Sequence, residues 1–404
     1  MRKLSRLLIY SHDSFGLGHI RRCRAIAQAL VSHRDDLSVL ILSGSPVIGS
    51  FEFRGRIDFV RIPGVVKLRH GDYTSFSLDI DINELMSMRS EIIRQTAELF
   101  RPDIFLVDKE PLGMRGEVRD TLTMLKAQGA VLILGLRDVM DAPDQLAEEW
   151  ERKNAMPSLR DLYDQIWVYG LPQIYDPLQG MPVSAGVASK MVYTGYIRRS
   201  ILPGSSDPGV AVPEDPFVLV TTGGGGDGDG LVDWVLSAYE HDPTIPTPAF
   251  VVLGPFMPAI HQSAFMERAE RLDKVTMVTF EPQIESIMRR AVGIVAMGGY
   301  NTFCEILSFD KRAIVVPRTV PRMEQFIRAD HAERLGLLNM LEDIIPRDPL
   351  VMARALHQLP NQPKPSEVSI PGILDGLTMI TAQVDDWLDR DEKSARLSLV
   401  HRTS

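Results

Sequence analysis

The stretch FVLVTTGGGGDGDG, residues 217–230, joins a short apolar run to four consecutive glycines. Its apolar part, residues 217–221, has the length and β-branched content of a buried strand, and a helical pattern follows the glycines. Glycine loses more conformational entropy on folding than other residues, so this run is costly to order. Close approach of the backbone to a phosphate is a reason to accept that cost. The stretch therefore predicts a strand, an anion-binding loop and a helix.

The same alternation of apolar runs and helical patterns extends along the chain in both directions. Residues 19–31, for example, place an apolar face at helical spacing. The expected strands are residues 7–11, 37–42, 57–62, 103–107, 131–136, 165–169, 191–194, 217–221, 249–253, 275–278, 293–296 and 313–316. Apolar strands that alternate with helices predict an α/β fold with parallel sheets covered on both faces.

A Pro-, Gly- and Ser-rich segment, residues 202–216, interrupts this alternation and is typical of a linker. We therefore expect two Rossmann-like parallel-sheet domains that face each other across a cleft. The expected segments are an N-terminal domain at 1–201, a C-terminal domain at 217–358, a helix that crosses back at 371–390, and a tail at 391–404.

Composition excludes several classes of protein. The formal charge of −9 opposes bulk attraction to nucleic acid, so no nucleic-acid partner is expected. Two cysteines, Cys23 and Cys304, cannot build a disulfide scaffold or a four-cysteine zinc site, and they suit a reducing cytoplasm. The apolar run at residues 7–10 is too short for a signal peptide.

Ligands of open α/β sheets bind outside the carboxyl ends of the strands. In residues 11–24, SHDSFGLGHIRRCR, a glycine turn leads into a helix, but no third glycine completes the dinucleotide fingerprint. His19 starts that helix, where the dipole favours neutral imidazole. A catalytic role and a polar cap beside a solvated arginine face are equally compatible with this pattern.

The C-terminal half carries three such loops, at residues 221–230, 297–305 (MGGYNTFCE) and 317–328 (PRTVPRMEQFIR). Together they indicate a site for a nucleoside diphosphate. Asp227 and Asp229 have the spacing of a metal-binding pair, but helix capping by one of them is the favoured interpretation. Glu305 is expected in the first turn of its helix. We expect neither a metal nor another cofactor.

Gly298-Gly299-x-Asn301-Thr302-x-x-Glu305, followed by Pro317 and Glu324-Gln325, resembles the donor motif of the family 28 glycosyltransferase C-terminal domain. The glycines at 223–226 resemble that family's phosphate loop, and residues 16–19 resemble its N-terminal glycine-histidine turn. This resemblance implies a GT-B fold. It also implies a nucleotide-sugar donor, a UDP-sugar in preference to a dTDP-sugar, bound by the C-terminal half.

The resemblance also implies roles. Glu305 would bind the ribose hydroxyls, Gln325 would touch the sugar, and His19 would lie near the reacting centre. The full set of expected donor residues is Gly18, Gly223, Gly224, Gly225, Gly298, Gly299, Asn301, Thr302, Glu305, Arg318, Glu324 and Gln325. For the catalytic base we favour His19, with Asp108 and Asp138 as further candidates, although both aspartates could cap helices.

The N-terminal loops have no counterpart in that resemblance, so the acceptor stays open. The acceptor-side candidates are Lys67, Arg69, Asp72, Tyr73, Lys109 and Arg137. They suit a hydroxylated or anionic partner, and a solvated surface loop is the equal alternative. Because the resembled enzymes include one with a lipid-linked acceptor, the acceptor is expected to be lipid- or glycan-linked. Basic residues near the N-terminus also predict weak peripheral contact with the inner face of the membrane.

The sequence thus predicts a cytoplasmic glycosyltransferase that moves a hexosyl or N-acetylhexosaminyl group from a nucleotide-diphosphate sugar to a hydroxyl acceptor, with inversion and without a metal. Two alternatives stay open. One is a nucleotide-sugar epimerase or hydrolase of the same fold, and the other is a non-catalytic nucleotide-sugar-binding protein.

Overall fold

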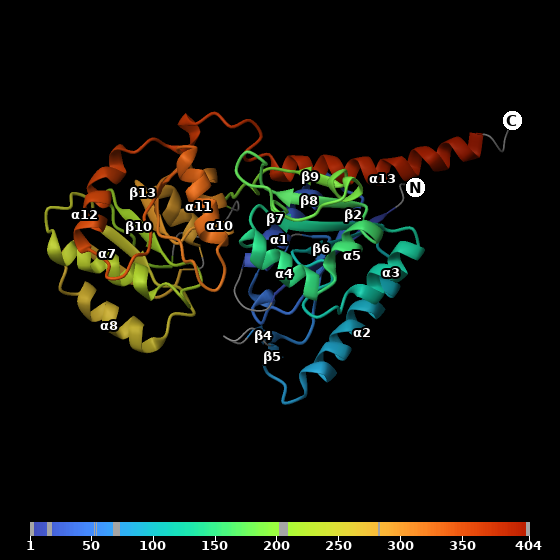
Figure 1. Cartoon of the computed structure of the whole chain (residues 1–404), viewed down its shortest axis with the longest axis horizontal. Helices are drawn as coiled ribbons and strands as arrows, with labels where there is room; N and C mark the ends of the chain where they lie inside the picture. The colour runs from blue at the N-terminus through green and yellow to red at the C-terminus, as the bar shows by residue number, and fades with distance from the viewer. Residues whose placement is uncertain are drawn as a thin grey trace. The chain divides into compact units, whose positions relative to one another are not determined.

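The computed structural model describes residues 4–13, 18–51, 53, 55–67, 73–201, 209–281 and 283–400, with only the backbone for residues 50, 67 and 391–400. The chain forms two compact units. The first comprises residues 1–197 together with 375–404, and the second comprises residues 198–374. Figure 1 labels their helices and strands.

The first unit is built on a seven-stranded parallel sheet. Its strands, in spatial order, are β3 (Ile57–Arg61), β2 (Leu37–Ser43), β1 (Ser5–Ser11), β6 (Ile104–Asp108), β7 (Val131–Arg137), β8 (Gln165–Tyr169) and β9 (Met191–Tyr193). Its helices are α1 (Gly18–His33), α2 (Ile82–Phe100), α3 (Arg119–Ala127), α4 (Pro143–Arg152), α5 (Ala155–Asp161), α6 (Ala185–Ala188) and α13 (Gly376–Val400). The order places the carboxyl ends of β2, β1, β6 and β7 side by side.

The second unit is built on a six-stranded parallel sheet. Its strands, in spatial order, are β12 (Val275–Val278), β11 (Ala249–Val252), β10 (Val218–Thr221), β13 (Gly293–Ala296), β14 (Arg312–Val315) and β15 (Asn339–Met340). Its helices are α7 (Asp229–His241), α8 (Ala259–Ala269), α9 (Ile284–Arg290), α10 (Tyr300–Ser308), α11 (Glu324–Arg334) and α12 (Pro349–Gln358). Here β10, β13 and β14 are neighbours.

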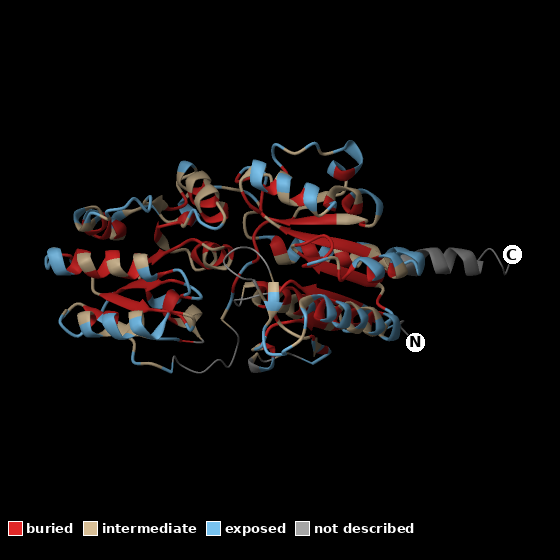
Figure 2. Cartoon of the chain, turned by 60° about the horizontal axis from the view of Figure 1, so that its bottom comes forward, coloured by how far each residue is buried: buried red, intermediate tan, exposed pale blue. Residues whose placement is uncertain are grey.

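The strands of both sheets are apolar because helices cover them. Every residue of β6 and of β10 is buried, as a strand between two helical layers requires. Figure 2 shows buried strands at the centre of each unit and helices whose outer sides are exposed. Full burial of one Leu, Ile or Val side chain contributes about 1.5–3 kcal/mol to folding. The predicted α/β class and parallel sheets are confirmed.

The C-terminal helix α13 packs within the first unit. Arg34, just after α1, bonds Asp385 at 2.9 Å and Asp389 at 3.1 Å. His33 Nε2 lies 2.8 Å from Asp385 Oδ2. The helix continues to Val400, ten residues beyond the segment expected to be helical.

Three strands were not predicted. A short antiparallel hairpin is formed by β4 (Val65–Lys67) and β5 (Tyr73–Ser75), in the segment expected to be a polar loop. Strand β15 adds a two-residue edge to the second sheet.

Candidate functional site

Polar side chains of the first unit gather where three neighbouring strands end. His12 and His19 follow β1, Asp108 is the last residue of β6, and Arg137 is the last residue of β7. Gly18 starts α1, and the residues 14–17 that precede it lie outside the described part of the chain. Because parallel strands end at one edge, residues far apart in sequence meet there.

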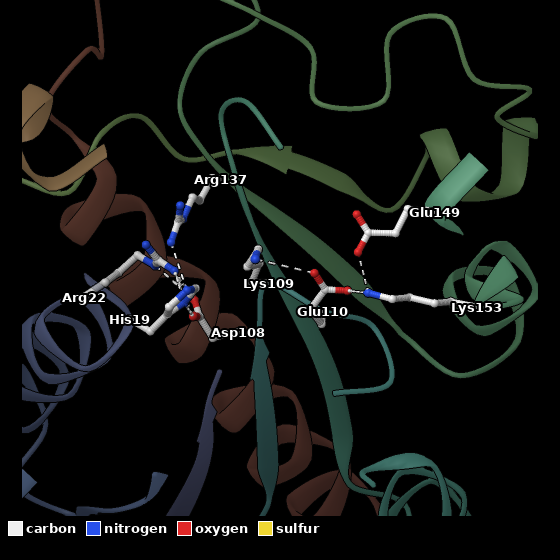
Figure 3. A network of polar contacts seen from close by, with 8 residues as sticks. All are labelled: His19, Arg22, Asp108, Lys109, Glu110, Arg137, Glu149 and Lys153. Carbon is white, nitrogen blue, oxygen red and sulfur yellow. Dashed lines mark hydrogen bonds and ion pairs between the residues drawn. The ribbon is translucent and has the colours of Figure 1, made fainter. Parts of the chain in front are cut away.

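His19 and Asp108 form a buried pair. The imidazole Nδ1 lies 2.5 Å from Oδ2 of the carboxylate, and their side chains are 10% and 1% exposed. Arg22, one turn further along α1, donates to both oxygens of Asp108 at 2.7 and 2.8 Å (Figure 3). Burial opposes ionisation of Asp108, but the Arg22 guanidinium and the His19 bond hold its pKa well below the usual range.

These contacts settle the tautomer of His19. Because Asp108 is ionised and can only accept, Nδ1 carries the imidazole proton. The lone pair of His19 is therefore on Nε2, and it accepts a hydrogen bond from Arg137 Nη2 at 2.9 Å. Burial and the nearby Arg137 charge lower the pKa of His19 to about 3. The imidazole is neutral, as expected, but burial is the main cause.

A second polar group continues along the same edge. Lys109 follows Asp108 and adopts the left-handed conformation, with φ of 72°. Its ammonium lies 3.6 Å from Glu110 Oε1, whereas Lys153 lies 2.8 Å from Glu110 Oε2 and 2.6 Å from Glu149. Figure 3 shows this group beside the His19 pair. A non-glycine residue held at positive φ costs energy and is often found at functional sites.

Of the other residues expected in the first unit, Asp138 directly follows Arg137 at the end of β7. Asp138 is buried and accepts from the Tyr196 hydroxyl at 2.8 Å, and the residue that precedes α4 is Ala142. Lys67 and Tyr73 face each other across the β4–β5 hairpin. Arg69 and Asp72 lie outside the described residues.

Arg6 and Arg22 do not lie together in the basic surface expected near the N-terminus. Arg6 is near the amino end of β1, where it donates to the Phe100 carbonyl, whereas α1 begins near the other end of that strand. Arg22 is 1% exposed and bonded to Asp108, so it does not belong to a solvated arginine face. No helix in the described part of the chain is long and apolar enough to cross a membrane.

In the second unit, the glycine run after β10 is packed against the loop after β11. Gly223 and Gly225 have positive φ, and the Gly224 carbonyl accepts from Phe256 N–H at 2.9 Å. A Cβ on Gly225 would overlap the Leu253 carbonyl oxygen and lie 3.1 Å from the Met257 nitrogen. Gly225 therefore meets a conformational and a steric requirement that other residues cannot meet.

Arg318, in the loop after β14, connects the loop after β10 with the start of α11. Its guanidinium lies 3.2 Å from Asp227 and 2.8 Å from Glu324, and its backbone N–H donates to Gln325 Oε1 at 3.2 Å. The capping interpretation for the acidic pair is wrong: α7 is preceded by Gly228, with no capping side chain. Within the described residues, no three His, Cys, Asp or Glu side chains group as a metal ion would require.

The glycines after β13 lie directly before α10. Gly298 has φ of 77°, and a Cβ there would lie 2.6 Å from Val315 Cγ1. Gly299 caps α10, and the Gln325 amide nitrogen lies 4.0 Å from where a Cβ on Gly299 would be.

The expected polar donor residues lie on α10 itself. Asn301 accepts from Arg199 at 2.5 Å, and Thr302 is half-buried. Glu305 is not in the first turn: it is the sixth residue of α10, and only 2% of it is exposed.

Residues 218–343 match the model of the glycosyltransferase family 28 C-terminal domain. The second unit therefore contains a region similar to that domain, which we call the family 28 domain. The match includes all the expected donor residues from Gly223 to Gln325 and confirms the predicted resemblance and the enzyme class, glycosyltransferase.

Solved structures of the same fold support the two-unit architecture. A glycosyltransferase of kitacinnamycin has 14% identity and a TM-score of 0.63, with 96% of this chain and 99% of that chain covered. A UDP-N-acetylglucosamine 2-epimerase has 14% identity and a TM-score of 0.62, with 97% of each chain covered. MurG of Acinetobacter baumannii has 12% identity and a TM-score of 0.57, with 96% and 99% covered. None of the proteins of curated function matches.

Two arginines at these edges were not predicted as site residues. In the family 28 domain, Arg328 on α11 is 1% exposed, donates to the Gly298 carbonyl at 3.1 Å and lies over the Tyr300 ring. In the first unit, Arg22 holds Asp108 ionised. The helical spacing of Arg22 from His19 was a usable signal, because residues three apart share a helix face.

Proposed function

We propose that this glycosyltransferase moves a hexosyl or N-acetylhexosaminyl group from a UDP-linked sugar to a hydroxyl acceptor, with inversion. The observation that carries the proposal is the buried His19–Asp108 pair. In it, a neutral imidazole presents its lone pair at the strand ends while a carboxylate fixes its tautomer. A base oriented in this way contributes about 10²–10⁴-fold to proton-transfer catalysis.

The proposed step is a single displacement. The acceptor oxygen bonds the anomeric carbon as the bond from that carbon to the diphosphate oxygen breaks, and UDP leaves with the electron pair. His19 Nε2 takes the acceptor proton, and ionised Asp108 stabilises the resulting imidazolium. One displacement inverts the anomeric centre.

The family 28 domain supports the donor side. Its glycines leave the backbone of the loops uncovered by side chains, as the proposed diphosphate site requires, and Gly298 and Gly299 directly precede α10. Backbone N–H groups and a helix N-terminus stabilise negative charge without a metal. Asp227 is ion-paired with Arg318, which suits a role in shaping the loop. In this proposal Glu305 binds the ribose, and Gln325 contacts the sugar.

A donor panel tests the function. The intact protein is heated with UDP-, dTDP- and GDP-sugars, because a ligand that binds the folded state raises the melting temperature. The best donor is then incubated with and without hydroxyl acceptors, and UDP, free sugar and epimerised donor are measured. Acceptor-dependent UDP release is expected. Epimerised donor, free sugar at equal rates without acceptor, or binding without turnover would each refute transfer.

A further inference from the structure

The lone pair of the proposed base, on His19 Nε2, already accepts a hydrogen bond. Arg137 Nη2 donates to His19 Nε2 at 2.9 Å, and the opposite ring nitrogen is committed to Asp108. A lone pair that accepts from arginine cannot at the same time accept the proton of an acceptor hydroxyl. Arg137 must therefore leave Nε2 before transfer can occur.

We propose that the acceptor carries an anionic group, a phosphate or a carboxylate, close to its attacking hydroxyl, and that this group draws Arg137 away from His19. This inference rests on the proposed glycosyl transfer. Arg137 is then a specificity-determining residue that uncovers the base when an anionic acceptor is bound.

Charge explains the direction of this exchange. When a guanidinium bonds a neutral imidazole only the donor is charged, whereas its bond to phosphate or carboxylate joins two opposite charges and is stronger. Arginine can also bind such a group through two parallel N–H groups. A neutral hydroxyl acceptor offers neither gain.

Lys109 supplies a second cation from the neighbouring strand. Its backbone N–H donates to the Gly135 carbonyl of β7 at 2.7 Å, so the ends of β6 and β7 hold Lys109 and Arg137 close in the sheet. Lys153 contacts Glu110 more closely than Lys109 does, at 2.8 Å against 3.6 Å. Part of the Glu110 charge is thereby compensated by Lys153, which favours an anion near Lys109.

The first experiment follows His19 itself in the full chain and does not depend on turnover. Nitrogen NMR of the labelled histidine side chains is recorded during a titration with inorganic phosphate, and the His19 signals are assigned by their loss in His19→Gln. A saturable shift of the Nε2 resonance is expected, absent in Arg137→Gln and retained in Arg160→Gln, an exposed arginine of α5. An unmoved Nε2 signal, or the same shift in Arg137→Gln, would overturn the proposal.

The second experiment compares matched acceptors with a UDP-sugar. Glycerol 3-phosphate is paired with glycerol, and phosphatidylglycerol in vesicles is paired with diacylglycerol in vesicles of phosphatidylcholine, which distinguishes a soluble acceptor from a lipid headgroup. The anionic member should have about 10–100-fold higher kcat/KM, and Arg137→Gln should bring that ratio close to one. Equal use of neutral acceptors, or a ratio that survives Arg137→Gln, would refute it. If no acceptor releases UDP, the proposed transfer fails, and the phosphate titration still decides the role of Arg137.

Discussion

His19 Nδ1 donates to Oδ2 of Asp108 over 2.5 Å, although 89 residues separate them in the chain. The bond exists because β1 and β6 are neighbours in the sheet, so the start of α1 lies above the last residue of β6. It fixes which nitrogen of the imidazole carries the lone pair, and the proposed proton transfer depends on that choice.

Replacing the base should affect turnover far more than donor binding. His19→Gln is expected to lower kcat by about 10²–10⁴-fold, while UDP affinity by calorimetry stays within a factor of about two, since the proposed UDP ligands are in the family 28 domain. His33→Gln, at the exposed end of the same helix, is the matched control. Turnover that is the same in both variants would remove His19 from the mechanism.

Asp108→Asn should lower both activity and stability. The asparagine no longer enforces the Nδ1–H tautomer, and it leaves Arg22 as a buried charge without its carboxylate. Breaking a buried ion pair from one side costs about 3–5 kcal/mol of unfolding free energy. The double variant Asp108→Asn/Arg22→Met should recover part of the stability in urea unfolding but none of the kcat. Recovered activity in the double variant would contradict the proposed role of Asp108.

The strands could be predicted because their signal is local. Each of the twelve expected runs overlaps a strand, since a strand buried on both faces must be continuously apolar. The β4–β5 hairpin was missed because Lys67, Tyr73 and Thr74 are polar or half-exposed and each strand has three residues. Such a pattern resembles a loop as closely as it resembles a strand.

Individual site residues could be predicted from the sequence, but the bonds between them could not. Residue types and strand ends indicated His19, Asp108 and Arg318. Which groups bond depends on sheet order, which short patterns do not encode. One of Asp227 and Asp229 was expected to cap a helix, yet Asp227 is paired with Arg318, about ninety residues further along the chain. Asp138 was weighed as a base, yet its carboxylate bonds Tyr196.

Asp13 should make stability fall as pH rises through mild acid. It is 3% exposed, it accepts from Ser43 at 2.5 Å, and burial raises its pKa from 3.8 to about 6. Between those values the folded state holds a proton that the unfolded state has lost, so its contribution to stability is complete below 3.8 and lost above 6.

The measurement is urea unfolding of the wild type and Asp13→Asn from pH 4 to 7. Comparing the two removes the opposing contribution of His19, whose lowered pKa makes stability rise with pH between about 3 and 6.5. Relative to Asp13→Asn, the wild type should lose stability as pH increases. Parallel curves would show that Asp13 titrates normally.

Two adjacent glycines offer a matched test of the phosphate loop. Gly225→Ala should destabilise the protein by roughly 1–3 kcal/mol and abolish UDP binding, because its φ is 87° and its Cβ would overlap the Leu253 carbonyl. Gly226→Ala has an ordinary φ and meets nothing closer than 3.9 Å. It should change thermal stability little and retain most UDP affinity. If the two changes had equal effects on stability and UDP affinity, the loop would not have the conformation in which Gly225 contacts the Leu253 carbonyl.

Glu305 is the residue that the family resemblance assigns to the ribose hydroxyls. It is 2% exposed, so it is not a surface glutamate. If its carboxylate accepts from both ribose hydroxyls, each charge-assisted bond contributes about 1.5–3 kcal/mol. A nucleotide without the 2′-hydroxyl leaves one carboxylate oxygen without that donor. UDP should therefore bind more tightly than dUDP, which has the same base.

Glu305→Gln should weaken UDP by about 10–100-fold and shrink the gap between UDP and dUDP, because the amide loses the charge that distinguishes them. Calorimetry with both nucleotides on the wild type and the variant gives the two ratios. Glu267→Gln, an exposed glutamate of α8, controls for the change of charge. If UDP weakens but the UDP:dUDP ratio does not change, Glu305 supports the fold of α10, and another residue must recognise the ribose.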